Sequence, residues 1–315
     1  MTRRLNLFLL ILLIVIGGPF WWLLLDTSQV GAEDKRIDLS ELRALADAQP
    51  GQKPTRVNME LAAWRLVLGD IMAAGSGLKR RMVAALAFRL EVPGNGPVMI
   101  DSGTTRAIAR EMGFDRFDAQ AQSRIDSDLR SASLILLTHE HPDHAGGLAL
   151  AARAPDGASL MQRVVMNREQ VPGSAATTAS HWPHGTVPGM VLNDSGAQAV
   201  APGVVVLPSP GHTPGSQMVY VRLASGAEYL FAGDTASMAV NWIEQRPRSR
   251  LLTEWLAPED RKATVGWLRA IAEAKRRAPG LHIVPGHDFE WLHDRDHNSG
   301  VIGRSSAGAE NVSGN

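Results

Sequence analysis

The segment Thr138-His139-Glu140-His141-Pro142-Asp143-His144 decides the fold and the chemistry of this 315-residue chain. It follows directly on residues 133–138 (SLILLT), an apolar run that predicts a buried strand. Three histidines and an aspartate therefore leave one sheet edge together. Neutral imidazoles bind zinc and other first-row metals, and carboxylates complete such sites. The segment predicts a metal site.

Pro142 disfavours a helix at His141, so we expect an extended loop here. In an extended chain, residues two apart point the same way, which lets His139 and His141 share one ion. Asp143 and His144 then turn toward a neighbouring ion. The alternative without metal is a surface loop that happens to be rich in histidine.

Three further ligand candidates each follow a predicted strand and a glycine: His212 in PGHTPG, Asp234 in GD, and His287 in PGHD. The glycine allows a tight turn at the strand end. Any one of them alone is more typical of a structural residue. Together with the first segment, however, they supply enough ligands for two divalent ions.

Strand-like and helix-like stretches alternate along most of the chain, which predicts an α/β fold with helices packed over sheets in layers. The predicted strands are residues 83–92, 97–101, 133–138, 204–207, 218–223, 228–231 and 281–284, and the predicted helices are 104–112, one ending at 148–153, and 259–277.

Composition excludes several chemistries. The formal net charge is zero, so no nucleic-acid partner is expected, and the chain has no cysteine, which removes thiolate ligands and cysteine nucleophiles. Any metal must be bound by His, Asp or Glu.

The N-terminus carries a membrane signal. Residues 5–25 contain no charged side chain and follow Arg3 and Arg4, which predicts a single transmembrane helix inserted in the lipid bilayer through residues 5–25. The positive-inside rule places the remaining chain outside the cytoplasm, in the periplasm of a Gram-negative cell. The alternative is secretion after cleavage near Ala32, with Val30 and Ala32 as the small residues of a cleavage site.

Four segments are expected from these observations: an anchor or signal sequence at 1–28, a linker with a short helix at 29–54, a catalytic domain at 55–297, and a disordered tail at 298–315. Ser40 is a possible cap for the short helix at 39–48.

The motif H-x-H-x-D-H at residues 139–144, with its three later partners, resembles the metallo-β-lactamase superfamily, in its lactonase and glyoxalase II-like branch. The resemblance implies a four-layer αββα sandwich with metals at one sheet edge. It also implies one ion on His139, His141 and His212, a second on Asp143, His144 and His287, and Asp234 as a bridge. Asp101 would orient the ligand loop without binding metal, or would cap a turn.

The expected reaction is attack of a metal-bridging hydroxide on the carbonyl of a small ester or lactone. Asp234 would neutralise charge and fix the separation of the ions, while Asp143 would orient the hydroxide and carry its proton. Zn²⁺ is the expected metal, with Fe or Mn as alternatives. The alternatives in function are a phosphodiesterase or nuclease, a β-lactam hydrolase, and a non-catalytic metal-binding module.

Three features bear on which class of substrate the chain would hydrolyse. Subclass B1 and B2 β-lactamases have a cysteine ligand, which this chain lacks. Lactonases acting on acyl-homoserine lactones often carry a tyrosine shortly after the bridging Asp, whereas Asp234 is followed here by Thr-Ala-Ser-Met. An extracytoplasmic location disfavours glyoxalase II activity.

Four side chains are candidates for contact with a small-molecule substrate, with packing against the surface as the alternative: His181, Trp182, His184 and Trp242. Three other tryptophans are expected in the core: Trp255, Trp267 and Trp291.

Overall fold

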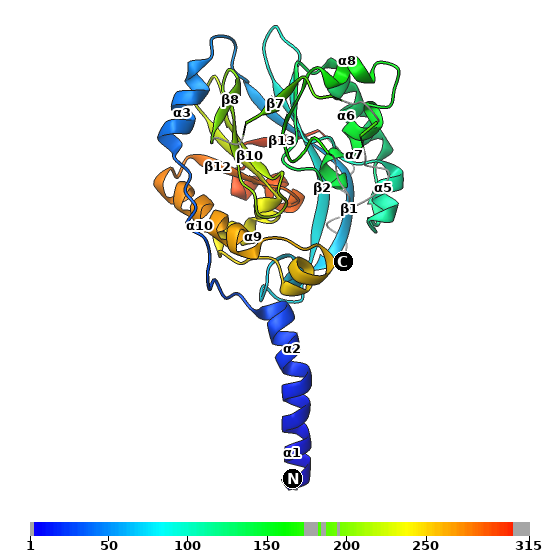
Figure 1. Cartoon of the computed structure of the whole chain (residues 1–315), viewed down its shortest axis with the longest axis vertical. Helices are drawn as coiled ribbons and strands as arrows, with labels where there is room; N and C mark the ends of the chain where they lie inside the picture. The colour runs from blue at the N-terminus through cyan, green and yellow to red at the C-terminus, as the bar shows by residue number, and fades with distance from the viewer. Residues whose placement is uncertain (1–2, 173–181, 184–186, 194–195, 305–315) are drawn as a thin grey trace.

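A computed structural model of the chain describes residues 3–172, 182–183, 187–193 and 196–304. It places two β-sheets face to face between layers of helices (Figure 1). The first sheet has the order β13 (Val301–Gly303), β1 (Arg56–Leu68), β2 (Arg80–Glu91), β3 (Val98–Ile100), β5 (Leu134–Leu136), β6 (Val164–Asn167) and β7 (Met190–Leu192), with β4 (Arg116–Phe117) paired to β1. The second has the order β12 (Leu281–Pro285), β11 (Glu228–Gly233), β10 (Gln217–Arg222), β9 (Val204–Pro208) and β8 (Gln198–Ala201).

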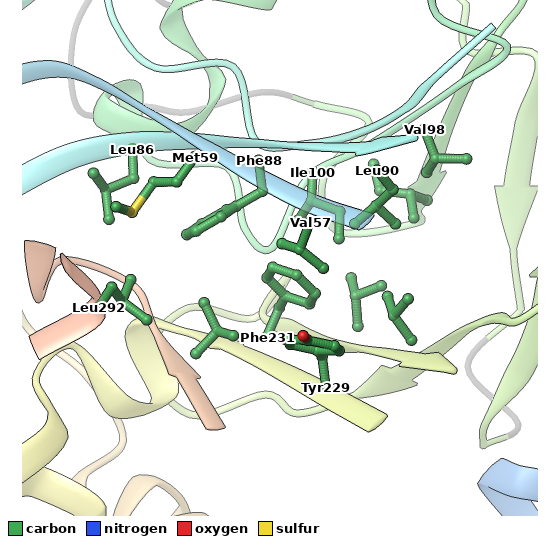
Figure 2. Packing of buried hydrophobic residues seen from close by; sticks show 14 of the residues in the cluster. Val57, Met59, Leu86, Phe88, Leu90, Val98, Ile100, Tyr229, Phe231 and Leu292 are labelled. Carbon is green, nitrogen blue, oxygen red and sulfur yellow. The ribbon is translucent and has the colours of Figure 1, made fainter. Parts of the chain in front are cut away.

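The core lies between the inner faces of the sheets. Because side chains alternate along a strand, Phe88 and Ile100 of the first sheet point toward Phe231 and Tyr229 of the second (Figure 2). The rings of Phe88 and Phe231 meet edge to face with centroids 5.0 Å apart. This packing fixes the relative position of the two sheets, and with it the relative position of their ends.

Helices cover both outer faces, which confirms the predicted four-layer sandwich. The first sheet is covered by α5 (Arg106–Glu111), α6 (Ala119–Ser131), α7 (Pro142–Ala151) and α8 (Gly157–Met161), and the second by α3 (Leu39–Ala48), α9 (Ala239–Ile243) and α10 (Arg261–Arg277) (Figure 1). Shorter elements connect them: α4 (Gly69–Met72), η4 (Asp234–Ala236), η5 (Leu251–Leu256), α11 (Phe289–His293) and η6 (Arg295–His297).

The segment predicted to be a linker is instead part of the fold. Ile37, Leu42 and Ala46 are buried against the second sheet and α10, because α3 has one apolar face and that face is needed to cover the sheet. The short helix is present where it was predicted, but its cap is Asp38, whose carboxylate accepts from the backbone of Ser40, rather than Ser40 itself.

The predicted disordered tail is wrong for residues 298–304. Val301 pairs in parallel with Val57 at the free edge of β1, and Arg304 forms an ion pair with Asp128 at 2.6 Å. Two β-branched residues, Val301 and Ile302, suit this edge. Residues 305–315 lie outside the described part of the chain.

The N-terminal helix projects from the body of the domain (Figure 1). It runs over residues 3–25 as α1 (Arg3–Leu12), η1 (Leu13–Gly17), α2 (Gly18–Phe20) and η2 (Trp21–Leu25). Among the described residues it is the one helix that is long and apolar enough to cross a membrane, with a mean hydropathy of 2.5, and a signal sequence passes the same test.

Candidate metal centre

The seven predicted ligands lie together where strands of both sheets end. His139 and His141 follow β5; His141 is extended, with φ −65° and ψ 150°, but the chain bends at Thr138 and Glu140. The predicted loop is wrong beyond that point, because α7 begins at Pro142 and carries Asp143 and His144 in its first turn. Proline is well suited to the first helical position, where its missing N–H has no partner to lose.

The ligand atoms form three overlapping groups, each with all its atoms within 4.8 Å of one another: His139, His141 and His212; His139, His144 and Asp234; and Asp143, His144 and His287. His212 Nε2 lies 2.9 Å from His141 Nδ1, and His144 Nε2 lies 3.5 Å from His287 Nε2.

Asp234 lies between the group of His139, His141 and His212 and the group of Asp143, His144 and His287. Its carboxylate oxygens are 3.5 Å from His212 Nε2 and 3.0 Å from His287 Nε2. This is the position that a residue shared by two ions would need.

Glycines at two strand ends make this approach possible. Gly233 has φ 51°, a left-handed conformation that glycine adopts without strain, and it turns the chain at Asp234. A Cβ on Gly286 would lie 2.5 Å from Asp234 Oδ1. A larger residue would therefore be strained at position 233 and would clash with Asp234 at position 286, so both positions before a ligand need glycine.

Hydrogen bonds to the outer nitrogens orient the imidazoles. His144 Nδ1 donates to Asp101 Oδ2 at 2.9 Å, and His287 Nδ1 donates to the carbonyl of Ala84 at 2.7 Å. Both Nε2 atoms are thereby directed into the centre, where each can offer a lone pair to a metal.

Asp101 contacts both the ligand segment and His144. It is buried, has φ 60°, and accepts from the backbone N–H of Thr138 at 2.7 Å as well as from His144. One carboxylate thus ties the end of β3 to the first residue of the ligand segment.

Two residues that sequence reasoning missed complete the surroundings of His212. Glu259 Oε2 lies 3.2 Å from His212 Nδ1. The buried Arg248 contacts both Glu259 and His212, and its Nη1 donates to Asp234 Oδ2 at 3.3 Å. Neither stands in a motif or directly after a predicted strand, so no local signal in the sequence could have identified them.

The histidines of the centre differ in the direction of their pKa shifts. Burial, with neighbouring imidazoles, holds the pKa of His139 well below its usual range and lowers that of His141 to about 3. Burial also lowers the pKa of His144, but Asp101, Asp143 and Asp234 outweigh it and raise this pKa to about 9. In the metal-free protein an extra proton therefore lies on His144 at neutral pH.

A divalent metal fits these residues. His139 Nε2 is buried and has no hydrogen-bond partner among the described residues. An imidazole nitrogen buried in this way costs free energy unless something binds it. The nitrogen and oxygen donors around it suit zinc, iron or manganese.

The structure bears differently on the four residues predicted to contact substrate. His181 and His184 lie outside the described residues. Trp182 packs beside α6–α8 and donates from Nε1 to the carbonyl of Gln170 at 3.1 Å, so its contact with substrate stays a prediction. Trp242 is 9% exposed and packs in the core on the second sheet, so that prediction is wrong.

A cleft of about 520 Å³ borders His212. Its walls include Glu259, the loop of Thr213 and Pro214, and the N-terminal segment at Glu33 and Lys35. The N-terminal segment therefore approaches the centre.

Known proteins resemble this chain at three levels. Residues 81–299 match the family model of the metallo-β-lactamase superfamily. Two hydroxyacylglutathione hydrolases are similar in sequence: that of Anaeromyxobacter dehalogenans is 32% identical over 49% of this chain and 48% of its own length, and that of Albidiferax ferrireducens is 34% identical over 32% and 33%. This chain thus spans about half of the first relative and a third of the second.

Solved structures share the fold. A quorum-quenching N-acyl homoserine lactone lactonase superposes with a TM-score of 0.59 at 18% identity, covering 76% of this chain and 95% of its own. A dizinc quorum-quenching lactonase superposes with a TM-score of 0.50 at 12% identity, covering 75% and 90%. At these identities the likeness shows the fold alone. Because the family model covers more than half of the chain, including every candidate ligand, the chain belongs to the metallo-β-lactamase superfamily.

Proposed function

We propose that the chain is a binuclear metal-dependent hydrolase that adds water to the carbonyl carbon of a small ester or lactone and breaks its acyl–oxygen bond. One observation carries the proposal: seven His and Asp side chains form overlapping metal-binding groups, with Asp234 between them. A pair of divalent ions held close together activates water and polarises a carbonyl oxygen.

The side chains of the centre have separate tasks in this proposal. His139, His141 and His212 would hold one ion, and Asp143, His144 and His287 would hold the other. Asp234, between the two groups, would balance their charge. The Asp143 carboxylate is buried, with Oδ2 3.7 Å from His287 Nε2, and it would hold the proton released from water.

The positions around the ligands keep the groups in place before substrate arrives. Asp101 holds His144, and Glu259 holds His212 against the cleft that borders it. Such outer partners increase metal affinity by fixing the ring orientation and the tautomer.

A thioester is the second candidate bond, and the curated relatives favour it. Both are hydroxyacylglutathione hydrolases, and they are more similar to this chain in sequence than the lactonases are. Thioesters and lactones present the same electrophilic carbonyl to the same nucleophile, so the metal centre suits both.

We also propose that residues 1–28 remain attached as a membrane anchor and that the catalytic domain lies outside the cytoplasm. Asp26 is buried and pairs with Arg250 at 2.7 Å, and Arg261 donates to the carbonyl of Asp26 at 2.7 Å. Cleavage near Ala32 would remove these partners of two arginines from the folded domain, which argues for the uncleaved form.

Metal analysis of the full-length protein with a substrate panel tests the function. We expect about two bound ions and turnover of lactones, esters or thioesters. His141→Ala and Asp234→Ala should lose metal and activity, whereas His293→Ala, an exposed histidine, should lose neither.

Other outcomes would redirect or refute the proposal. Cleavage of bis(nitrophenyl) phosphate alone would favour a phosphodiesterase, and turnover of β-lactams alone would favour a lactamase. Fewer than one ion, with activity untouched by both ligand substitutions, would refute a metal-dependent mechanism.

A further inference from the structure

A partly apolar surface of the domain surrounds the end of the N-terminal helix. Trp255 and Leu256 in η5 are 70% and 67% exposed, and Leu78, before β2, is 62% exposed. Lys79 and Arg80, also exposed, follow Leu78. We call these five residues the juxtamembrane face. Trp255, predicted to be in the core, is more exposed than Trp21 of the helix at 56%, so that prediction is wrong.

The helix is joined firmly to this part of the domain. The Arg250 guanidinium lies over the ring of Trp22, 5.3 Å from its centroid, and pairs with Asp26. The backbone N–H of Gly75 donates to the carbonyl of Leu24 at 3.1 Å. Because residues before and after the end of the helix are held, the domain cannot turn freely about it.

The juxtamembrane face lies close to the level at which the helix would leave a bilayer. Trp255 lies in η5, which begins directly after Arg250, so the two residues are about one helical turn apart. The helix end η2 contacts α4, and α4 contacts η5. Figure 1 shows η5 and the turn before β2 at the end of the domain from which the helix projects.

We propose that the juxtamembrane face docks onto the bilayer that holds the helix. Tryptophan is favoured at the boundary between headgroups and acyl chains, and leucine beside it adds apolar contact. Lys79 and Arg80 suit the phosphates of the headgroups. The domain then has a second attachment that sets its orientation, so that the metal centre is held at a fixed height and tilt.

This proposal rests on the proposed anchor and is independent of the proposed reaction. It is tested on the full-length protein in vesicles of phosphatidylcholine with phosphatidylglycerol. Since the chain has no cysteine, single-cysteine variants accept one fluorescent label each. Trp255→Cys and Leu78→Cys probe the face, Val15→Cys probes the helix, and Ser159→Cys, exposed on α8 at the far end of the domain, is the control.

The readout is quenching of the label by lipids that carry a nitroxide at shallow or deep positions. We expect shallow quenching at 255 and 78, deep quenching at 15, and none at 159. Because a cysteine at 255 removes part of the face, the label at 78 is also measured with Trp255 intact and with Trp255→Ser and Leu256→Ser together. The double change should reduce its quenching while metal content stays the same.

Three results would overturn the docking proposal. Quenching at 15 with none at 255 or 78 would leave an anchored domain held away from the lipid. No quenching at 15 would refute the anchor itself. A blue-shifted label at 255 in detergent that depends on protein concentration would show that a second copy of the chain covers the face.

Discussion

Replacing Asp101 by asparagine should weaken the ion bound through His144 and leave the fold intact. Asparagine tolerates the positive φ of this position, and its carbonyl oxygen can still accept from the backbone of Thr138. Its amide N–H₂, however, then faces His144 Nδ1, where the carboxylate accepted at 2.9 Å. Two donors cannot share this contact, so His144 is driven to carry its proton on Nε2, the atom that faces the centre.

The expected loss is large for a change of one atom. Removing an outer partner of a ligand typically lowers metal affinity by about 10–100-fold, or about 1.4–2.8 kcal/mol. The reversed tautomer puts Asp101→Asn near the upper limit. The ion on His139, His141 and His212 should be affected less, since Asp101 contacts His144 directly but reaches His139 through the Thr138 hydroxyl.

Zinc titration of the metal-free protein against a coloured chelator measures both affinities. Asp118→Asn makes the same chemical change at the cap of α6 and serves as the control, because asparagine caps a helix as well as aspartate does. If Asp101→Asn binds two ions with the affinities of the parent, the assigned role of Asp101 is refuted.

Four further effects are predicted. Zinc binding at neutral pH should release a proton from His144, because the pKa of this imidazole is about 9, above its usual 6.5. Calorimetric heats of zinc binding that are equal in buffers of different ionisation enthalpy would contradict this. By the same shift, the metal-free fold gains stability that is fully present below pH 6.5 and is lost as the pH rises through about 9, measurable by thermal melting. Glu259→Gln should take from the buried Arg248 one of its carboxylate partners and leave it Asp234, costing up to about 3–5 kcal/mol of stability and about tenfold in zinc affinity; a parental melting temperature would exclude this role. Asp26→Asn should expose residues 26–35 to limited proteolysis, and unchanged digestion would show that the junction does not depend on this ion pair.

The parts predicted well were those with a local cause. Strand ends followed by glycine and a ligand were found because the turn, the glycine and the ligand lie within a few residues of one another. The αββα layers followed from the alternation of strand and helix patterns together with the resemblance to a known family.

The parts predicted badly depend on contacts between distant segments. Pro142 has opposite effects inside a helix and at its first position, and the packing of α7 on the first sheet decides between them. Val301 looks like part of a polar tail until the edge of β1 is available to it. Arg248 and Glu259 meet His212 only after η5 and α10 fold back on the second sheet, and Trp255 looks like a core residue until its exposure is known.

The pairing of β13 with β1 has a consequence for the order in which the protein matures. Among the strands of the described residues, β1 comes first along the chain and β13 comes last, and the register joins Val57 to Val301. Until residues 301–303 have been translated, the outer edge of β1 at residues 57–59 therefore offers unpaired backbone groups, which can capture another nascent strand. A premature stop codon between His287 and β13 would leave every candidate ligand in place and still yield a protein prone to aggregate, so the pairing of β13 acts as a late checkpoint on assembly.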